Sequence, residues 1–509
     1  MSIQKYPVGH QDFAKIITEH FVYVDKTHFV HKLAERGGYY FLSRPRRFGK
    51  SLLISTFDYL FRAKKELFEG LYIYDHWEFE EFPVIKISFS NIGYREIPLS
   101  DAISQELVSI GESYDIKLNA SSPSLIFDEL IEKLHRKFNK KVVVLIDEYD
   151  KPLIDYLDKD NLHKAIENRG ILKSFYSILK DADSHLKLVF ITGVSKFSQV
   201  SIFSDLNNLN DITLDLEYNS ICGINQNELA ANFRKELTVF DEVKIKKWYN
   251  GYKWDVNAES VYNPFSLLNF FDKGGKYTNF WYSTGTPSFL MKMCKENRFY
   301  ELNNVTLSQT SLNAFDIDNL NIIPILFQTG YLTLTSYNDT LNIYHLDYPN
   351  SEVKSSFVEG LLEVYSGSRE PISSNILNKL YLALTQNTKS YLEDAINLSF
   401  EHIPYDLWSK ENEKFYHIIL HLLFTLLGVN IESEVHTKNG RADAVIHFEN
   451  NVYCLEFKLD KSAEEAIQQI EKRGYLEKYR SSKETLHKIG INFSSENKKV
   501  DGLIWEVVE

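Results

Sequence analysis

Short runs of apolar residues alternate with longer amphipathic stretches over the first part of the chain. The clearest runs are YYFLS at 39–43, PVIKISFS at 83–90, VVVLIDE at 142–148 and LKLVFITG at 186–193. Runs with almost no polar positions are typical of strands buried on both faces of a parallel sheet, and the stretches between them supply the covering helices. The pattern therefore predicts a parallel α/β domain over residues 1–215.

The strand pattern stops after residue 215, where helical periodicity and aromatic-rich turns replace it. WYNGYKW at 248–254 and VYNPFSLLNF at 261–270 predict a helical lid subdomain over residues 216–300. Its aromatic rings could stack bases, although packing between helices is the favoured interpretation. Over residues 301–395, a helix-like IIPILFQ leads into YLTLTS and LNIYHL, which predict a hairpin. We interpret this part as winged-helix-like, followed by a helical connector.

The last part of the chain, residues 396–509, has a different order of elements. A strongly apolar helix pattern at 415–428 comes first. Three strands, a helix and two further strands are then predicted at 430–437, 441–448, 452–458, 463–480, 487–493 and 503–508. This αβββαβ order predicts a second sheet, separate from the first and restriction-endonuclease-like in its arrangement.

Length, charge and cysteine content narrow the function classes. A chain of 509 residues is too long for one core, so several domains are expected. A net charge of −13 argues against coating nucleic acid through the overall field, but leaves a local basic groove open. Three scattered cysteines and no membrane-length apolar run predict a cytoplasmic protein with no membrane partner.

A phosphate-binding loop is predicted where the first apolar run meets a helix. Gly49, Lys50 and Ser51 stand at this junction, so that backbone N–H groups face the phosphates, Lys50 reaches their oxygens and Ser51 binds magnesium. Asp147 and Glu148 end a later apolar run, where the aspartate can hold the magnesium shell and the glutamate can polarise water. ATP and Mg²⁺ are therefore the predicted cofactors.

The loop departs from the simple glycine pattern because Arg44 occupies its first position and Arg46 and Arg47 follow. The last two arginines either add positive charge at the phosphates or are ordinary surface residues. The polar residues at the end of the strand that finishes at Gly193 also have two interpretations. They either sense the γ-phosphate or only cap the strand end. The candidates for that sensor are Thr192, Ser195 and Lys196.

A second set of polar residues lies in the predicted C-terminal sheet. Period-two alternation places Glu456 and Lys458 on one face of their strand, and Asp443 in the preceding strand can approach them. Two carboxylates can hold one or two divalent ions, while a lysine can orient or deprotonate the attacking water. Glu434 could add a metal ligand, and Gln469 could orient the water or contact the nucleic-acid backbone.

At these two sets of residues the sequence resembles the bacterial AAA-ATPase-like family, whose members join a P-loop domain to a C-terminal PD-(D/E)XK nuclease-superfamily domain. The matching phrases span nearly the whole chain: YVDKT, FLSRPRRFGKSL, LFEGLYI, VVVLIDEYDKPL, ITGVSKFS, WYNGY, YNPFSLL, QTGYLTL, and GRADAVI with LEFKLD and AIQQIEKRGY. The resemblance implies an arginine-rich loop as a family habit. It also implies a nucleotide site at Lys50, Ser51, Asp147 and Glu148, and a nuclease site at Asp443, Glu456 and Lys458 with Gln469.

Three functional hypotheses follow. The first is an ATP-regulated, magnesium-dependent nuclease acting on DNA. The second is an ATP-driven switch or scaffold whose C-terminal domain binds nucleic acid or a protein without cutting. The third is an interaction protein with two inactive sites. The sequence leaves the oligomeric state open, and a role in defence against foreign DNA or in a mobile element rests on analogy.

Overall fold

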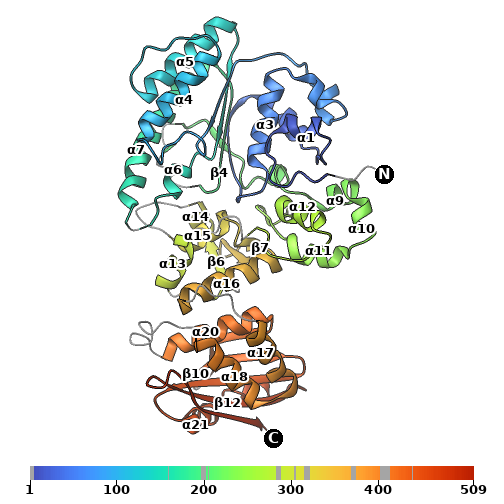
Figure 1. The fold of residues 1–509 in the computed structure, drawn as a ribbon, viewed down its shortest axis with the longest axis vertical. Helices are drawn as coiled ribbons and strands as arrows, with labels where there is room; N and C mark the ends of the chain where they lie inside the picture. Colours follow the sequence, from blue (N-terminus) through green and yellow to red (C-terminus); the bar gives the residue numbers. More distant parts are fainter. Residues whose placement is uncertain are drawn as a thin grey trace. The chain divides into compact units, whose positions relative to one another are not determined.

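A computed structural model shows two compact units (Figure 1). The first comprises Met1–Phe289 and Leu302–Lys354, and the second Leu290–Glu301 and Ser355–Glu509. The structure describes residues 5–158, 160–196, 202–203, 206–281, 288–297, 299–302, 305–313, 321–367, 374–401, 413–437 and 440–508. The four domains predicted from the sequence, at 1–215, 216–300, 301–395 and 396–509, stay a prediction.

The first unit is built on a five-stranded sheet in the order β2-β3-β4-β1-β5, with every neighbouring pair parallel. The strands are β1 (Gly38–Ser43), β2 (Val84–Ser88), β3 (Val142–Asp147), β4 (Leu186–Gly193) and β5 (Leu209–Asp211). The predicted parallel α/β sheet is confirmed. The sequence did not indicate β5, because three residues with two polar side chains carry no strand pattern.

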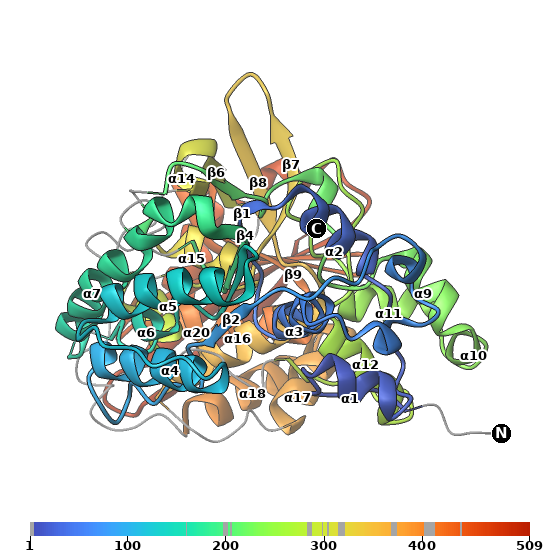
Figure 2. The ribbon, with the colours of Figure 1, turned by 90° about the horizontal axis from the view of Figure 1, so that it is seen from above.

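Helices cover both faces of this sheet. Helices α4, α5 and α7 lie side by side on one face, and α1 and α3 lie on the other (Figures 1 and 2). Their bounds are α1 (Phe13–Thr18), α2 (Thr27–Arg36), α3 (Lys50–Phe61), α4 (Leu99–Ser113), α5 (Pro123–Phe138), α6 (Lys151–Ile154) and α7 (Leu162–Asp181). In α5, Phe127, Leu130, Ile131 and Leu134 recur at helical spacing and are fully buried.

A group of short helices follows the sheet: α9 (Gln226–Asn232), α10 (Arg234–Leu237), α11 (Glu242–Tyr249) and α12 (Pro264–Asp272). Their core is aromatic and includes Phe233, Tyr249 and Phe270, each fully buried. The ring of Tyr6 packs on Phe233, with ring centroids 6.4 Å apart, so the N-terminal segment is attached to this helical subdomain. The aromatics of WYNGYKW that are buried here serve packing.

A small three-stranded antiparallel sheet in the order β6-β8-β7 lies after these helices. It joins β6 (Val305–Ser308), α14 (Gln309–Asn313), α15 (Ile322–Gln328), β7 (Thr333–Asn338) and β8 (Ile343–Asp347). Figure 2 shows the β7–β8 hairpin projecting from this small sheet, and the winged-helix interpretation of this part stays a prediction. Helix α15 has no basic residue, and all of its side chains except that of Ile323 are buried.

The second unit contains a mixed sheet in the order β13-β12-β11-β10-β9, in which β11 and β12 are parallel and the other pairs antiparallel. The elements are α13 (Ser288–Glu296), α16 (Ser351–Ser366), α17 (Ser374–Gln386), α18 (Lys389–Glu401), α20 (Glu413–Leu427), β9 (Asn430–Thr437), β10 (Gly440–Phe448), β11 (Asn451–Leu459), α21 (Ala463–Arg473), β12 (Thr485–Ser494) and β13 (Lys499–Val508). The unit boundary falls within α16. The predicted αβββαβ arrangement is confirmed.

One predicted element was too long. The helix expected at 463–480 ends at Arg473, because Gly474 adopts the left-handed conformation (φ 60°) and caps it. A short 3₁₀ turn at Glu477–Tyr479 follows.

A buried carboxylate in the first unit makes its stability depend on pH. Glu352 has no solvent exposure, and its Oε1 accepts hydrogen bonds from Ser266 Oγ (3.0 Å) and the Trp281 N–H (2.8 Å). Burial raises the pKa of Glu352 from 4.5 to about 7, and these hydrogen bonds oppose that rise. Between pH 4.5 and 7 the unfolded chain has released this proton while the folded chain keeps it. Stability is therefore lost as the pH rises through this window.

We expect Glu352→Gln to have little effect near pH 5 and to stabilise the first unit at pH 8 by up to about 3 kcal/mol. The measurement is thermal unfolding of both proteins across this range. Glu112→Gln, at an exposed position of α4 in the first unit, is the matched control. An equal change at both pH values would contradict the assignment.

Candidate functional site

The loop between β1 and α3 encloses the side chain of Lys50. Gly49 has φ 91°, a left-handed conformation that glycine adopts without strain, and Lys50 begins α3. Lys50 Nζ donates to the carbonyls of Arg44 (2.8 Å) and Pro45 (3.0 Å). Burial lowers the pKa of Lys50, and the nearby carboxylates of Glu148 and Asp147 oppose that change. The loop is therefore formed, with its lysine held at the centre.

Arg44 explains the departure from the glycine pattern. Its side chain is fully buried and donates to the main-chain carbonyls of Ser43 (2.8 Å), Thr213 (2.9 Å) and Tyr218 (2.9 Å). The guanidinium also lies 4.0 Å from the ring centroid of Trp254, a cation–π contact. Burial lowers the pKa of Arg44 to about 10. Arg44 thus ties the loop to the segment after β5 and to the helical subdomain.

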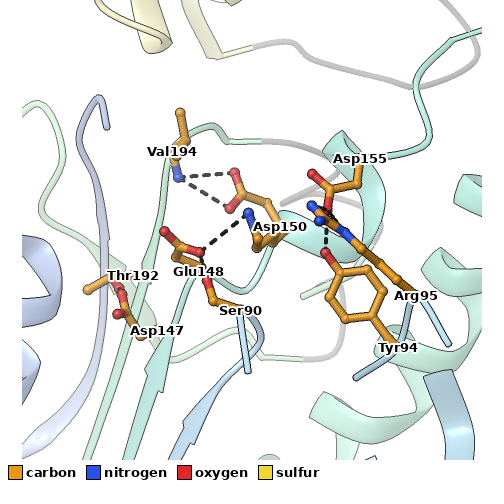
Figure 3. A network of polar contacts seen from close by, with 10 residues as sticks. Ser90, Tyr94, Arg95, Asp147, Glu148, Asp150, Asp155, Thr192 and Val194 are labelled. Atoms are coloured by element: carbon orange, nitrogen blue, oxygen red, sulfur yellow. Dashed lines mark hydrogen bonds and ion pairs between the residues drawn. The ribbon is translucent and has the colours of Figure 1, made fainter. Parts of the chain in front are cut away.

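The acidic end of β3 meets polar residues of both neighbouring strands (Figure 3). Strand β4 lies between β1 and β3, and Thr192 Oγ1 donates to Asp147 Oδ1 at 2.6 Å. Glu148, in the left-handed region at φ 54°, accepts a hydrogen bond from Ser90 Oγ, just beyond β2. Lys151 Nζ is 3.8 Å from the Glu148 carboxylate.

The other two sensor candidates have different partners. Ser195 donates through its N–H (2.7 Å) and Oγ (2.8 Å) to the buried carboxylate of Asp150. Lys196 Nζ pairs with Asp211 at 2.7 Å. Thr192 is therefore the candidate that the structure brings to the Asp147–Glu148 pair.

A cleft of about 370 Å³ opens over this loop. Arg46, Arg47, Lys50, Ser51 and Glu148 line it, so basic groups face a carboxylate across the space. Residues 7–11 and the start of α12 close its other sides. An apolar cavity of about 90 Å³ adjoins it, sharing Gly49 and Leu52. Cationic and apolar compartments side by side fit a nucleoside triphosphate.

The carboxylate pair of the second unit is assembled by neighbouring antiparallel strands. Asp443 on β10 accepts the N–H of Phe457 on β11 through its Oδ2 (2.8 Å). Lys458 Nζ contacts Glu456 Oε1 and the Phe457 carbonyl, both at 2.9 Å. Glu456 and Lys458 are 1 % and 7 % exposed, so this ion pair is buried.

The charges around the carboxylates of Asp443 and Glu456 favour binding of a cation. Burial and the adjacent Asp443 raise the pKa of Glu456 to about 7, and Lys458 opposes the rise. The second carboxylate oxygen of Glu456, Oε2, is buried and has no hydrogen-bond partner. A divalent ion would satisfy that oxygen and relieve the repulsion between the two carboxylates.

The predicted metal ligands Glu434, Asp443 and Glu456 stay a prediction. Across the parts of the chain that the structure describes, no cluster of three or more His, Cys, Asp or Glu side chains could hold a metal ion. Glu434 lies on β9, but its side chain falls outside the described residues. Asp443 and Glu456 are therefore the carboxylates available for this interpretation.

The comparisons with known proteins cover both sites. Residues 7–203 match a family model described as "Predicted AAA-ATPase", and residues 411–502 match one described as "PD-(D/E)XK nuclease superfamily". An "Uncharacterized protein in vnfD 5'region" from Azotobacter chroococcum mcd 1 is 38 % identical over 521 residues, covering 99 % of each chain. The chain belongs to the AAA-ATPase-like family with a C-terminal PD-(D/E)XK domain. No solved structure matches it.

Membership in the AAA-ATPase-like family confirms the resemblance seen in the sequence. The matched segments contain the phosphate loop with the Asp147–Glu148 pair, and the Asp443–Glu456–Lys458 group. The helical and winged parts lie between the two segments. Within the described residues, no helix combines the length and the apolar character that crossing a membrane requires.

Several residues near the two sites of this AAA-ATPase-like protein were missed in the sequence. Tyr475 is buried, and its hydroxyl lies 3.3 Å from Gln469 Nε2. Burial raises the pKa of Tyr475, and the charges of Glu456 and Asp443 raise it further. Ser90 and residues 7–11 were missed likewise. The signal that could have identified Ser90 is its position just after β2, the strand that pairs with β3.

Proposed function

We propose that this protein hydrolyses ATP and that its nucleotide state controls a metal-dependent nuclease acting on DNA phosphodiester bonds. The observation that carries the proposal is the buried Glu456–Lys458 pair beside Asp443, in a chain whose phosphate loop is also formed. A scaffold has no need of a buried carboxylate with an unpartnered oxygen beside a second, partly buried carboxylate, since removing such charge from water costs free energy. Metal binding repays that cost.

In the ATPase half, each residue has a stated role. Gly49 and the start of α3 offer backbone N–H groups to the phosphates, and Lys50 neutralises their charge. Ser51 and Asp147 would hold Mg²⁺, which supplies charge neutralisation at the phosphates. Glu148 polarises the attacking water. Arg46 and Arg47 add positive charge at the cleft, and the base occupies the adjoining apolar cavity.

In the nuclease half, Asp443 and Glu456 would hold Mg²⁺, with Glu434 as a further ligand. The ion, when bound, activates water and stabilises negative charge on the phosphate. Lys458, whose Nζ lies 2.9 Å from Glu456 Oε1, would orient that water as the ammonium or accept a proton from it as the neutral amine. Gln469, oriented by Tyr475, positions the water or the DNA backbone. Three buried free cysteines suit a reducing cytoplasm, where we place the protein.

An ATP-driven switch whose nuclease-fold domain binds nucleic acid or a protein without cutting is the second candidate. One observation favours it: Lys458 already occupies Glu456 Oε1, an oxygen that a metal would otherwise use. In this alternative the Asp443–Glu456–Lys458 group stabilises the sheet, and the nuclease-fold domain itself provides the surface for the nucleic-acid or protein partner.

The test is cleavage of supercoiled and linear plasmid DNA by the full chain with Mg²⁺ or Mn²⁺, with and without ATP. We expect cleavage that EDTA abolishes and that ATP changes. Asp443→Asn, purified identically, controls for contaminating nucleases. Lys50→Ala should lose ATP hydrolysis and the effect of ATP together. ATP hydrolysis without cleavage by the wild type in any condition would favour the switch.

A further inference from the structure

Arg47 has a backbone conformation that costs free energy. Its φ is 69°, in the left-handed region, where glycine is free of strain and other residues lose about 1 kcal/mol or more. Gly49, two residues later, meets the same demand with glycine. Glycine at position 47 would remove this backbone strain. The presence of arginine there points to a function of its side chain.

The Arg47 side chain is held by the helical subdomain. Its guanidinium carbon lies 4.9 Å from the ring centroid of Phe265, a cation–π contact, and both residues line the cleft with Lys50 and Glu148. Phe265 sits in the first turn of α12, which two contacts fix. Asn263 caps this turn by accepting the Ser266 N–H (3.2 Å), and Ser266 Oγ donates to Glu352 (3.0 Å). The aromatic ring is therefore a rigid platform for a flexible cation.

We infer that Arg47 contacts the terminal phosphates of bound ATP from within the same chain, and that Phe265 positions it. This inference rests on the proposed ATPase. An arginine that stabilises charge in phosphoryl transfer can come from the same chain or from a partner. Its planar fork suits phosphate oxygens, and the aromatic contact restricts its motion before nucleotide arrives. One chain then contains the whole cationic set, and hydrolysis needs no neighbouring subunit.

The decisive variant is Arg47→Gly. It removes the guanidinium and relieves the backbone strain, which offsets the lost contact with Phe265 and the greater freedom of glycine in the unfolded chain, so the variant should keep a stability close to that of the wild type. We expect kcat for ATP to fall at least about thirtyfold while KM changes less than about threefold. Free guanidinium, well below denaturing concentrations, should restore part of kcat. The surface control is Arg136→Ala, at an exposed arginine of α5. Alanine replaces glycine in this control because glycine would weaken the helix.

The role of Phe265 is tested separately. Phe265→Leu should lower kcat about threefold to tenfold, and Phe265→Tyr, which keeps the aromatic face, should not. To separate action within one chain from action between chains, Arg47→Gly protein is mixed with Lys50→Ala protein. We expect no recovery of ATP hydrolysis in the mixture. If Arg47 acts only within its own chain, the Lys50→Ala protein cannot supply its Arg47 to the site of the Arg47→Gly protein.

The outcomes separate this inference from the ATPase proposal. If the wild type hydrolyses ATP and Arg47→Gly stays within about twofold of it, or recovers on mixing, the inference is wrong and the ATPase stands. If the wild type binds ATP without turnover, calorimetry of Arg47→Gly decides: a fall in ATP affinity of up to about threefold with ADP affinity retained supports Arg47, and equal effects on both nucleotides overturn it. If the wild type binds neither nucleotide, both proposals fall.

Discussion

Replacing Asp443 with asparagine is expected to lower metal-dependent DNA cleavage by at least about a hundredfold. Changing groups that only support metal ligands already costs about tenfold to a hundredfold, so removing a ligand charge should cost more. The fold should survive, because the asparagine carbonyl can still accept the N–H of Phe457 that Asp443 accepts at 2.8 Å. The measurement is the initial rate of plasmid nicking with Mn²⁺. Unchanged circular dichroism should accompany the loss.

The pH dependence of metal binding gives this prediction a second, independent readout. Glu456 has a pKa of about 7, so it is protonated at lower pH and Mn²⁺ affinity should decline as the pH falls through 7. Asp443→Asn removes a charge that raises this pKa and should shift the decline to lower pH. Lys458→Met removes a charge that lowers it and should shift the decline to higher pH. Shifts in the same direction would show that Glu456 is not the titrating ligand.

Replacing Arg44 with methionine should destabilise the first unit by about 3–5 kcal/mol. Methionine keeps apolar volume against Trp254 but leaves the buried carbonyls of Thr213 and Tyr218 without the donors that reach them at 2.9 Å. Arg44→Lys should recover only part of the loss, because an ammonium lacks the two-nitrogen fork that bridges these carbonyls.

Urea unfolding, followed by a signal from the first unit, measures this effect. Arg136→Met, at an exposed arginine on α5, is the control and should change stability by less than about 0.5 kcal/mol. A similarly small effect for Arg44→Met would mean that the loop is held in place without its guanidinium.

Local patterns were enough to predict the elements that carry both sites. The strand at 186–193 and the helix at 322–328 have the predicted bounds, because apolar runs and their flanking residues determine them. The adjacency of Glu456 and Lys458 followed from period-two alternation. These features depend on neighbours within a few residues, which a single sequence displays directly.

Contacts between distant segments could not be predicted in this way. The partners of Arg44 lie about 170 residues away, and nothing near Thr213 or Tyr218 indicates a buried guanidinium. Residues 7–11 line the cleft, and Tyr6 just before them packs on Phe233 of the helical subdomain, a contact that no local pattern indicates. Strand order belongs to the same class: β4 is last among the four long strands in sequence, yet lies between β1 and β3.

The buried guanidinium of Arg44 has a consequence for finding related proteins. A sequence pattern that requires glycine at the position of Arg44 does not match this loop. A better query combines an arginine after the first strand with a glycine-lysine-serine triplet and a downstream tryptophan able to cover the guanidinium, as Trp254 does here. Such a query describes a loop whose conformation is fixed by a buried guanidinium. It would separate loops of this kind from loops whose conformation depends on glycine alone.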